Sequence, residues 1–326
     1  MRRLLGVDFP GTPATLTAMI ADVALDEPPA QPRLLARYPG GQAGVLEYGP
    51  GTYRAMTIEY DTVADPDVAV TFDEFKATFR RIAGTDHGMR DAIWVSRFGD
   101  AVRQADRYRV GRVLLAGDAA HIHNPSGGQG LNLGVQDAVN LGWKLAAVVR
   151  GHAGEELLDS YHTERHPVGA RVLQNTHAQV ALSRPGHAVD ALRELFAELI
   201  RVEEVNGLLT GLVSALDVRY PIDGAHPLTG ARVPDTDLKT SDGDTRVSRL
   251  LHSGRGVLLD LTEDPALRAA AAGWADRVDL VPARHADARL DGVDAVLVRP
   301  DGYVAWVAPT DVTLPRALTT WFGPAR

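Results

Sequence analysis

The residues best suited to do chemistry lie in one stretch near the middle of the chain, residues 111–134. A short apolar run leads to Gly117-Asp118, and the glycine-rich sequence Asn-Pro-Ser-Gly-Gly-Gln-Gly follows at 124–130. Glycines let a ligand approach the backbone closely and leave amide N–H groups free to donate. A helix that begins near Leu131 would direct its positive end to the same place. The pattern therefore predicts a strand, an acidic turn and a ligand-binding loop that opens into a helix.

This combination suits the ribityl chain and ring of a flavin. Asp118 follows the strand, where its carboxylate could accept hydrogen bonds from a polyol. Pro125 would give a rigid edge without a donor beside the ring, and a helix N-terminus would stabilise the negative charge of a reduced isoalloxazine. A lone glycine pair would more often be a simple connecting turn. The complete run, taken with Gly117-Asp118, favours the flavin interpretation.

Two pairs of histidines and one serine are the other candidates for a metal site or a nucleophile. His162 and His166 have the spacing of two metal ligands on a helix, but no Glu directly follows the first His and no third ligand is evident. His121 and His123 lie two residues apart beside the glycine-rich loop, and metal binding there is the less favoured alternative. Ser126 lacks the first glycine of a nucleophile elbow. The sequence thus predicts neither a metal site nor an esterase.

Composition narrows the class of protein. A chain of 326 residues can form two or three domains. Its net charge of -8 disfavours binding to nucleic acid or to an anionic membrane. No apolar run approaches the roughly 20 residues that span a bilayer, and the absence of cysteine excludes disulfides and thiol catalysis. We expect a cytoplasmic protein that acts on a small molecule.

The first 110 residues indicate an antiparallel sheet. A hairpin is expected around Gly49-Pro50-Gly51. Thr71 and Glu74 form a capping-box pattern that predicts a helix carrying Phe75, Phe79 and Ile82. The strands are expected at residues 14–23, 45–48, 53–61 and 92–98.

Helices are expected beyond the glycine-rich loop. The strand before the loop should cover 113–116, and the first helix should run from Leu131 to a C-cap at Gly151. Its apolar stripe would be Val135, Ala138, Leu141, Leu145 and Val148. A second helix from Glu155 should stop at Pro167, and further helices should cover 168–183 and 188–218.

The last part of the chain has a different pattern. Residues from Tyr220 to Gly243 have the composition of a linker. Beyond them we expect strands at 257–261 and 278–281, a helix at 265–275 capped by Asp264, and a hairpin at 295–307 around Pro300-Asp301-Gly302. These elements predict a small α/β domain of thioredoxin-like outline that lacks thiol chemistry.

The central motifs also carry a family resemblance. The runs 111–140, Gly-Trp-Lys-Leu-Ala at 142–146, Leu-Leu-Asp-Ser-Tyr at 157–161 and Glu-Arg-His-Pro at 164–167 resemble the FAD-dependent aromatic hydroxylases, in the branch that acts on polyketide antibiotics and phenols. The implied fold class is α+β, with a substrate-binding antiparallel sheet at 1–110. The C-terminal part of a Rossmann-like FAD-binding domain would occupy 111–220, a linker 221–243 and a thioredoxin-like domain 244–326.

The resemblance implies a site and a reaction. FAD and NADPH (or NADH) would serve hydroxylation of an aromatic polyketide or phenol through a flavin C4a-hydroperoxide, with Pro125 against the reactive face of the ring as the catalytic contact. Strand alternation suggests Tyr53, Met56 and Trp94 as substrate contacts, although a place in the core or on the outer face of the sheet is at least as good an explanation for each. The cofactor-binding residues implied by the resemblance are Gly117, Asp118, Pro125, Gly127, Gly128, Gly130, Leu131 and Asn132.

One departure from the family pattern is large. The sequence holds no Gly-x-Gly-x-x-Gly fingerprint for the ADP half of the cofactor, and residues 1–8 resemble those that follow that segment in the family. A misassigned start and a truncated gene are both open explanations. The alternative function is a catalytically inactive homologue that acts as a binding or partner module. An exposed sheet edge and apolar surface would then favour a homo-oligomer.

Overall fold

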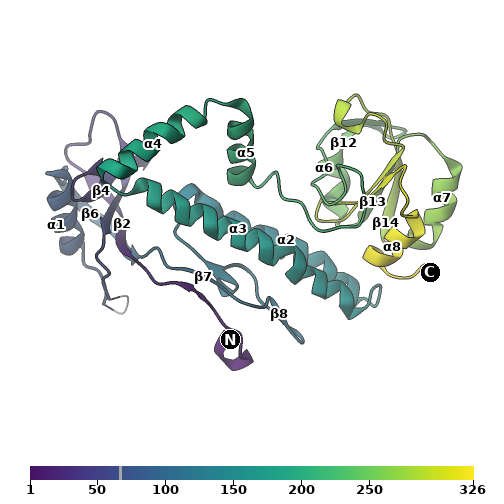
Figure 1. The fold of residues 1–326 in the computed structure, drawn as a ribbon, viewed down its shortest axis with the longest axis horizontal. Coiled ribbons are helices and arrows are strands. Elements are labelled where there is room, and N and C mark those ends of the chain that lie inside the picture. The colour runs from purple at the N-terminus through teal and green to yellow at the C-terminus, as the bar shows by residue number, and fades with distance from the viewer. Residues whose placement is uncertain (66–67) are drawn as a thin grey trace.

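The computed structural model describes residues 1–65 and 68–326. A five-stranded sheet lies at one end of the molecule, two long helices cross its middle, and a four-stranded sheet forms the other end (Figure 1). Among the described residues, no helix combines the length and the apolar character needed to cross a membrane. This mixed architecture is the α+β fold that the sequence predicted.

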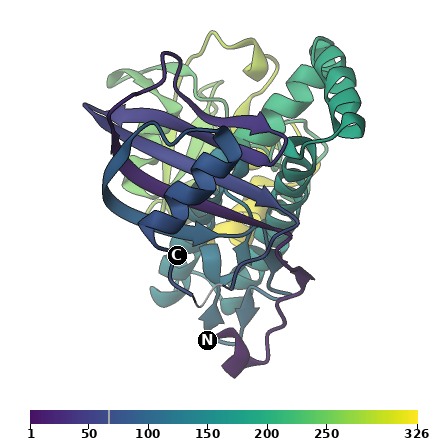
Figure 2. The same cartoon turned by 90° about the vertical axis from the view of Figure 1, so that its left-hand side faces the viewer.

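The five-stranded sheet is antiparallel and confirms the strands expected in the first 110 residues. Its order is β3-β4-β5-β2-β6. Helix α1 (Phe72–Ala83) covers the outer face of the sheet (Figure 2). Thr71 caps this helix by accepting the N–H of Glu74, as the capping-box pattern predicted. The strands are β2 (Leu16–Leu25), β3 (Arg33–Tyr38), β4 (Gly41–Gly49), β5 (Thr52–Tyr60) and β6 (Met89–Phe98).

Short strands connect this sheet to the centre of the molecule. The N-terminal segment lies beside the predicted flavin loop, because Arg2 Nη1 donates to the carbonyl of Ala119 at 2.6 Å. The strand before the loop is shorter than predicted and pairs only with its neighbour in a hairpin. These elements are a 3₁₀ helix (Arg2–Leu5), β1 (Gly11–Thr12), β7 (Val102–Gln104), β8 (Arg109–Val110), β9 (Val113–Leu114) and β10 (His121–Ile122).

The central helices are α2 (Gln129–Val149) and α3 (Asp159–Ser183). The prediction that a helix stops at Pro167 is wrong, since α3 continues through this proline. Residues on both sides of Pro167 are buried, so tertiary packing holds the helix together where its local sequence would interrupt it. The expected helix at 188–218 is two helices, α4 (His187–Leu199) and α5 (Glu203–Ser214), neither of which has a buried residue.

Helix α2 has an unusual distribution of side chains. The predicted apolar stripe is wrong at its start, because Val135 is 51% exposed and Ala138 is exposed. The buried face contains polar residues instead, namely Gln129, Asp137, Asn140 and Lys144 with Leu133 and Leu141. The polar face is inside because it meets charged partners on α3 and in the C-terminal domain, which one helix alone does not reveal. The helix ends at Val149 with Arg150 as its C-cap, one residue before the predicted C-cap Gly151, which follows in the left-handed region with its N–H bonded to the carbonyl of Val148.

The C-terminal domain confirms each strand expected beyond residue 257. Its sheet order is β14-β13-β15-β16, with β13 parallel to β14 and the other pairs antiparallel. The thioredoxin-like outline stays a prediction. Asp264 caps α7 by accepting the N–H of Ala266. The division of the chain at 110, 220 and 243 stays a prediction. The elements are β11 (Asp237–Thr240), β12 (Gly243–Arg246), α6 (Val247–Leu250), β13 (Gly256–Asp260), α7 (Pro265–Ala271), β14 (Val278–Pro282), β15 (Ala295–Val298), β16 (Val304–Ala308) and α8 (Leu314–Phe322).

Candidate functional site

A buried side chain holds the glycine-rich loop on one side, and the other side of the loop is exposed. Buried Asn124 accepts hydrogen bonds through Oδ1 from the N–H of Ser126 (2.9 Å) and from its hydroxyl (2.6 Å). Gly127 and Gly128 have φ of 74° and 65°, a left-handed conformation that favours glycine. Pro125 and both glycines are exposed. The loop thus presents bare backbone on a surface with a fixed shape.

Helix α2 begins at Gln129, two residues earlier than predicted. Its N-cap is Gly128, which has no side chain to satisfy the free N–H groups of the first turn. Gly130, Leu131 and Asn132 therefore lie inside that turn, and Leu131 is 80% exposed. Uncapped amides at a helix N-terminus suit an anionic or hydrogen-bond-accepting ligand.

The Gly117-Asp118 turn packs directly against α2. Gly117 has φ of 56°, and a Cβ added at Gly134 of α2 would lie 3.4 Å from the Cα of Gly117. The side chain of Asp118 is exposed. Within residues 1–65 and 68–326, no hydrogen bond or ion pair engages its carboxylate. This carboxylate is therefore available to a ligand.

A buried ionic cluster lies beneath this turn. Asp137 accepts from the N–H of Gly117 (3.1 Å) and lies 2.7 Å from Nε2 of His121. Its other oxygen accepts from Nε of Arg165 at 2.8 Å. Burial raises the pKa of Asp137, but the His121 and Arg165 contacts outweigh burial and hold this pKa below its usual value. Asp137 therefore remains an ionised acceptor.

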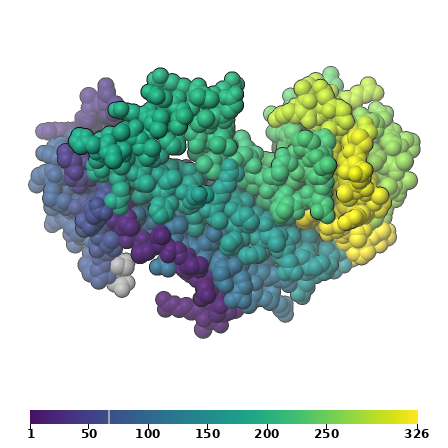
Figure 3. All heavy atoms as spheres, in the orientation of Figure 1, coloured from purple at the N-terminus to yellow at the C-terminus, as the bar shows by residue number. Residues whose placement is uncertain are grey.

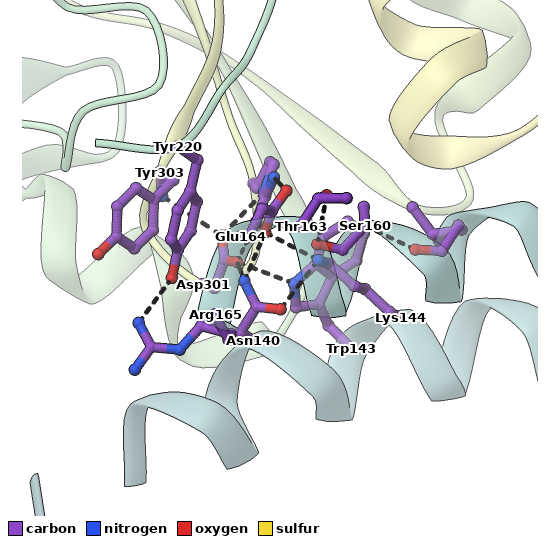
Figure 4. Close-up of polar contacts among 12 residues, drawn as sticks. Asn140, Trp143, Lys144, Ser160, Thr163, Glu164, Arg165, Tyr220, Asp301 and Tyr303 are labelled. Carbon is purple, nitrogen blue, oxygen red and sulfur yellow. Dashed lines mark hydrogen bonds and ion pairs between the residues drawn. The ribbon is translucent and has the colours of Figure 1, made fainter. Parts of the chain in front are cut away.

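A second cluster joins α2 and α3 to the C-terminal domain (Figure 4). Glu164 of α3 accepts from Arg299 through both oxygens at 2.6 and 2.8 Å, and from Lys144 of α2 at 2.8 Å. Asn140 donates to the same carboxylate at 2.6 Å. Burial alone would raise the pKa of Glu164, yet Arg299 and Lys144 lower it to about 2. Burial lowers the pKa of Lys144 to about 8.

A cavity of about 460 Å³ adjoins the start of α2. The surface is hollowed between α5 and the C-terminal domain (Figure 3), and residues of both regions line this cavity. Its lining includes Gly127 and Asn132 from the loop region and Gln136 and Tyr303 beyond it. Oε1 of Gln136 and the hydroxyl of Tyr303 are buried without a hydrogen-bond partner among the described residues. The cavity therefore offers polar atoms to a ligand or to water.

The structure separates the three predicted substrate contacts. Tyr53 pairs with Val23 and packs in the core under α1, so its predicted role facing the substrate is wrong. Met56 opposes Ile20 and Trp94 opposes Asp22, which places both on the other face of the sheet. Tyr53 and Met56 are three residues apart, and side chains alternate along a strand. Met56 and Trp94 thus stay as substrate candidates.

The residues considered for other chemistry have structural contacts. His162 accepts the N–H of Tyr108 at 3.3 Å, and the rings of His162 and His166 lie 4.9 Å apart beside Tyr108. Nδ1 of His123 lies 2.7 Å from the carbonyl of Asn124 within the loop. In the part of the chain that the structure describes, no three His, Cys, Asp or Glu side chains gather to hold a metal ion.

Sequence reasoning missed the buried charged residues of both clusters. Asp137, Asn140 and Lys144 recur every three or four residues along α2, which is the spacing of one helix face. That spacing is a signal, but polar residues on one face usually indicate solvent. Their partners Glu164 and Arg165 belong to the Glu-Arg-His-Pro motif at 164–167, for which the sequence predicted no structural role.

The arrangement fits a flavin in three respects. The uncapped amides of α2 can meet the ring, and a Cβ on Gly128 would find nothing within 4 Å, so its backbone faces open space. The exposed carboxylate of Asp118 lies where a polyol could bind. Residues 117 to 132 would therefore hold the ribityl and ring end of the cofactor.

Comparison with known proteins agrees with this geometry. Residues 1–176 match the family model of a FAD binding domain, and residues 226–325 match that of the C-terminal region of aromatic-ring hydroxylases. The chain is 49% identical over 342 residues to the 12-dehydrotetracycline 5-monooxygenase/anhydrotetracycline 6-monooxygenase of Streptomyces rimosus, covering 99% of this chain and 68% of the relative. It is also 46% identical over 331 residues to the dialkyldecalin synthase of Streptomyces rugosporus, covering 100% of this chain and 66% of that protein.

A solved structure supports the same assignment. CabE, an aromatic hydroxylase from angucycline biosynthesis, superimposes with a TM-score of 0.94 at 48% sequence identity, covering 100% of this chain and 68% of CabE. The chain thus spans about two thirds of the length of these relatives. Close similarity in sequence extends over both matched regions. The chain belongs to the family of FAD-dependent aromatic-ring hydroxylases.

Proposed function

We propose that the protein is a FAD- and NAD(P)H-dependent monooxygenase that hydroxylates an aromatic polyketide or a related phenol. The observation that carries this proposal is the segment 117–132, where the exposed backbone of Gly127 and Gly128, the uncapped amides of α2 and the free Asp118 carboxylate occur together. The overall reaction would convert an aromatic C–H bond, O₂, NAD(P)H and a proton into a phenol, NAD(P)⁺ and water. The bound flavin would supply the oxygen-transfer chemistry.

The chain's own residues would bind, orient and exclude water. Asp118 would accept hydrogen bonds from the ribityl hydroxyls. The first-turn amides of α2 would stabilise negative charge on the pyrimidine edge of the ring. Pro125, Gly127 and Gly128 would lie against the ring face, and Gly130 would allow the helix backbone to approach. Met56 and Trp94 would contact the substrate from the inner face of the sheet.

Trp94 is the more specific of the two substrate candidates. Its indole Nε1 donates to Asp22 Oδ2 at 2.6 Å, and Arg54 donates to both oxygens of Asp22 at 2.9 Å. Side-chain hydrogen bonding by Arg54 is the largest cause that lowers the pKa of Asp22. The indole is therefore fixed in orientation, and 39% of Trp94 remains exposed for contact with an aromatic ring.

The test begins with an absorbance spectrum of the purified protein with and without FAD. A bound, oxidised flavin absorbs near about 450 nm, a property of the cofactor. NADPH oxidation would then be followed with aromatic polyketides such as anhydrotetracycline, with mass spectrometry after ¹⁸O₂ labelling. Incorporation of one ¹⁸O atom is expected. The matched variants are Asp118→Asn, which should weaken FAD binding, and a change of the exposed Asp73 of α1, Asp73→Asn, which should not.

The same experiment separates hydroxylation from another reaction. The relative named a dialkyldecalin synthase is as similar to this chain as several monooxygenases are. Product formation that continues without O₂ and NAD(P)H would contradict the proposed hydroxylation. A protein that binds no FAD at micromolar concentration would contradict the proposed flavin site itself.

A further inference from the structure

One buried carboxylate closes the Gly117-Asp118 turn at both of its ends. Oδ2 of Asp137 accepts the N–H of Gly117 at 3.1 Å and lies 2.7 Å from Nε2 of His121. Within the turn, the N–H of Ala120 bonds the carbonyl of Gly117 at 2.8 Å. The segment from 117 to 121 is therefore a closed loop fastened to α2 through a single oxygen atom.

This attachment determines where Asp118 points. Gly117 is in the left-handed region, with φ of 56°, and its amide is held by Asp137. Asp118 follows directly, and its own carboxylate has no partner among the described residues. The direction of this free side chain is therefore set by the backbone on either side of it.

Arg165 keeps Asp137, the anchor of the turn, charged and in place. Its Nε donates to Oδ1 of Asp137 at 2.8 Å, and both residues are fully buried. Nη1 of Arg165 donates to the hydroxyl of Tyr220 at 3.2 Å, and Nη2 donates to the carbonyl of Leu133 at 3.3 Å. Tyr220 stacks on Tyr303 with ring centroids 3.9 Å apart. The anchor thus rests on residues of α2, α3 and the C-terminal domain.

We propose that Asp137 is a positioning residue that fixes the Gly117-Asp118 turn in the conformation that presents Asp118 to the flavin ribityl chain. Because Asp137 is itself 0% exposed, it would act through the turn and not by touching the cofactor. The cofactor half of this inference rests on the proposed function. The attachment of the turn stands on the geometry alone.

Two variants remove the anchor in different ways. Asp137→Asn keeps the shape but replaces one accepting oxygen by an NH₂ group, which must then face the N–H donor of Gly117 or that of Arg165. The double variant Asp137→Leu, Arg165→Met removes the acceptor without leaving an unpaired buried charge, and so preserves the fold if the single variant fails. The matched control is Asp260→Asn.

Asp260 is a suitable control because its chemistry is similar and its location is different. It is 3% exposed and accepts the N–H groups of Thr262 and Asp264 at 3.2 Å each, in the C-terminal domain. Its replacement should lower the melting temperature without touching the Gly117 turn. A purely structural effect of Asp137 would give the same result as this control.

Two readouts are taken at a temperature where circular dichroism shows every variant folded. Hydrogen–deuterium exchange follows the Gly117 amide in a peptide covering 113–122, and quenching of flavin fluorescence gives the dissociation constant for FAD. Both Asp137 variants should exchange this amide about tenfold faster or more and should bind FAD about tenfold more weakly or worse, a loss equivalent to one protein–ligand hydrogen bond. Asp260→Asn should leave both values unchanged.

The outcomes are separable. An unchanged exchange rate at Gly117 in either folded Asp137 variant would overturn the proposal. A faster exchange with unchanged FAD affinity would also overturn it, because the turn would then not matter for the cofactor. If the wild-type chain binds no FAD, the proposed function fails, while the exchange rates still decide whether Asp137 fixes the turn.

Discussion

Removal of the Glu164 charge should separate the C-terminal domain from the central helices at a measurable cost in stability. In the variant Glu164→Gln, one of the two carboxylate oxygens becomes an NH₂ group. The wild-type carboxylate accepts four hydrogen bonds, two from Arg299 and one each from Lys144 and Asn140. The amide cannot accept all of them, and Arg299 loses one of its two buried counter-charges, since its ion pair with Asp301 remains.

Two estimates of the cost agree. The pKa of Glu164 falls from 4.5 to about 2 in the folded protein, which corresponds to about 3 kcal/mol in favour of the ionised form at about 1.4 kcal/mol per pH unit. The side chain is only 2% exposed, so solvent screening is small. Removing one partner of a buried ion pair costs about 3–5 kcal/mol. We expect Glu164→Gln to lose about 3 kcal/mol at pH 7.

The assay is urea unfolding at several pH values, followed by tryptophan fluorescence, since the Arg299 guanidinium lies 4.4 Å from the Trp321 ring centre. Because the pKa is lowered on folding, the wild-type advantage is complete above pH 4.5 and declines as pH falls toward 2. The difference between wild type and variant should therefore shrink by about 2 kcal/mol between pH 7 and pH 3. A loss below about 1 kcal/mol at pH 7, or a difference that does not change with pH, would refute this reasoning.

Three further predictions concern individual residues. Lys144→Met should remove a dependence of stability on pH. Burial lowers the pKa of Lys144 from 10.5 to about 8, so the unfolded state binds more protons than the folded state between these two values. In urea titrations, wild-type stability should therefore rise relative to the variant from pH 7.5 to 9.5. Gly128→Ala should lower the free energy of unfolding by only about 1 kcal/mol through left-handed strain, yet should clearly weaken FAD binding in a fluorescence titration. A change in stability alone would contradict the proposed contact of Gly128 with the flavin ring. Trp94→Phe should raise the KM for the aromatic substrate several-fold in steady-state assays, whereas Tyr53→Phe, altered in the core under α1, should leave it unchanged; equal effects would contradict the assignment of faces.

Elements with a local cause were predictable from sequence. Thr71 and Glu74 define the start of α1 through neighbouring atoms only, and the structure contains that cap. The turn at Pro300-Asp301-Gly302 likewise depends on adjacent residues, and it connects β15 and β16 as expected. The glycine-rich loop was recognised for the same reason, although α2 begins two residues earlier.

Elements determined by distant partners were not predictable. Pro167 disfavours a helix locally, but buried residues on both sides keep α3 continuous. The polar face of α2 is inside because Glu164, Arg165 and Arg299 meet it from other segments. One sequence gives no information on such pairs, so the buried face was assigned wrongly at the start of the helix, at Val135 and Ala138, and correctly at Leu141. Tyr53 was misassigned similarly, since strand alternation defines two faces without saying which one α1 covers.

The continuity of α3 has a consequence for exchanging parts among related proteins. Near its start, Glu164 bonds Arg299 of the C-terminal domain; at its end, the Ser183 carbonyl accepts from Gln42 of the five-stranded sheet at 2.7 Å. Ser183 is 19 positions after Glu164, so the helix spans about 28 Å between these two contacts. Inserting or deleting one residue there would rotate one end by about 100° and shift it by about 1.5 Å relative to the other. Hybrid proteins that combine a sheet from one relative with a C-terminal domain from another should therefore keep the length of this helix, because it fixes the distance and the rotation between the two.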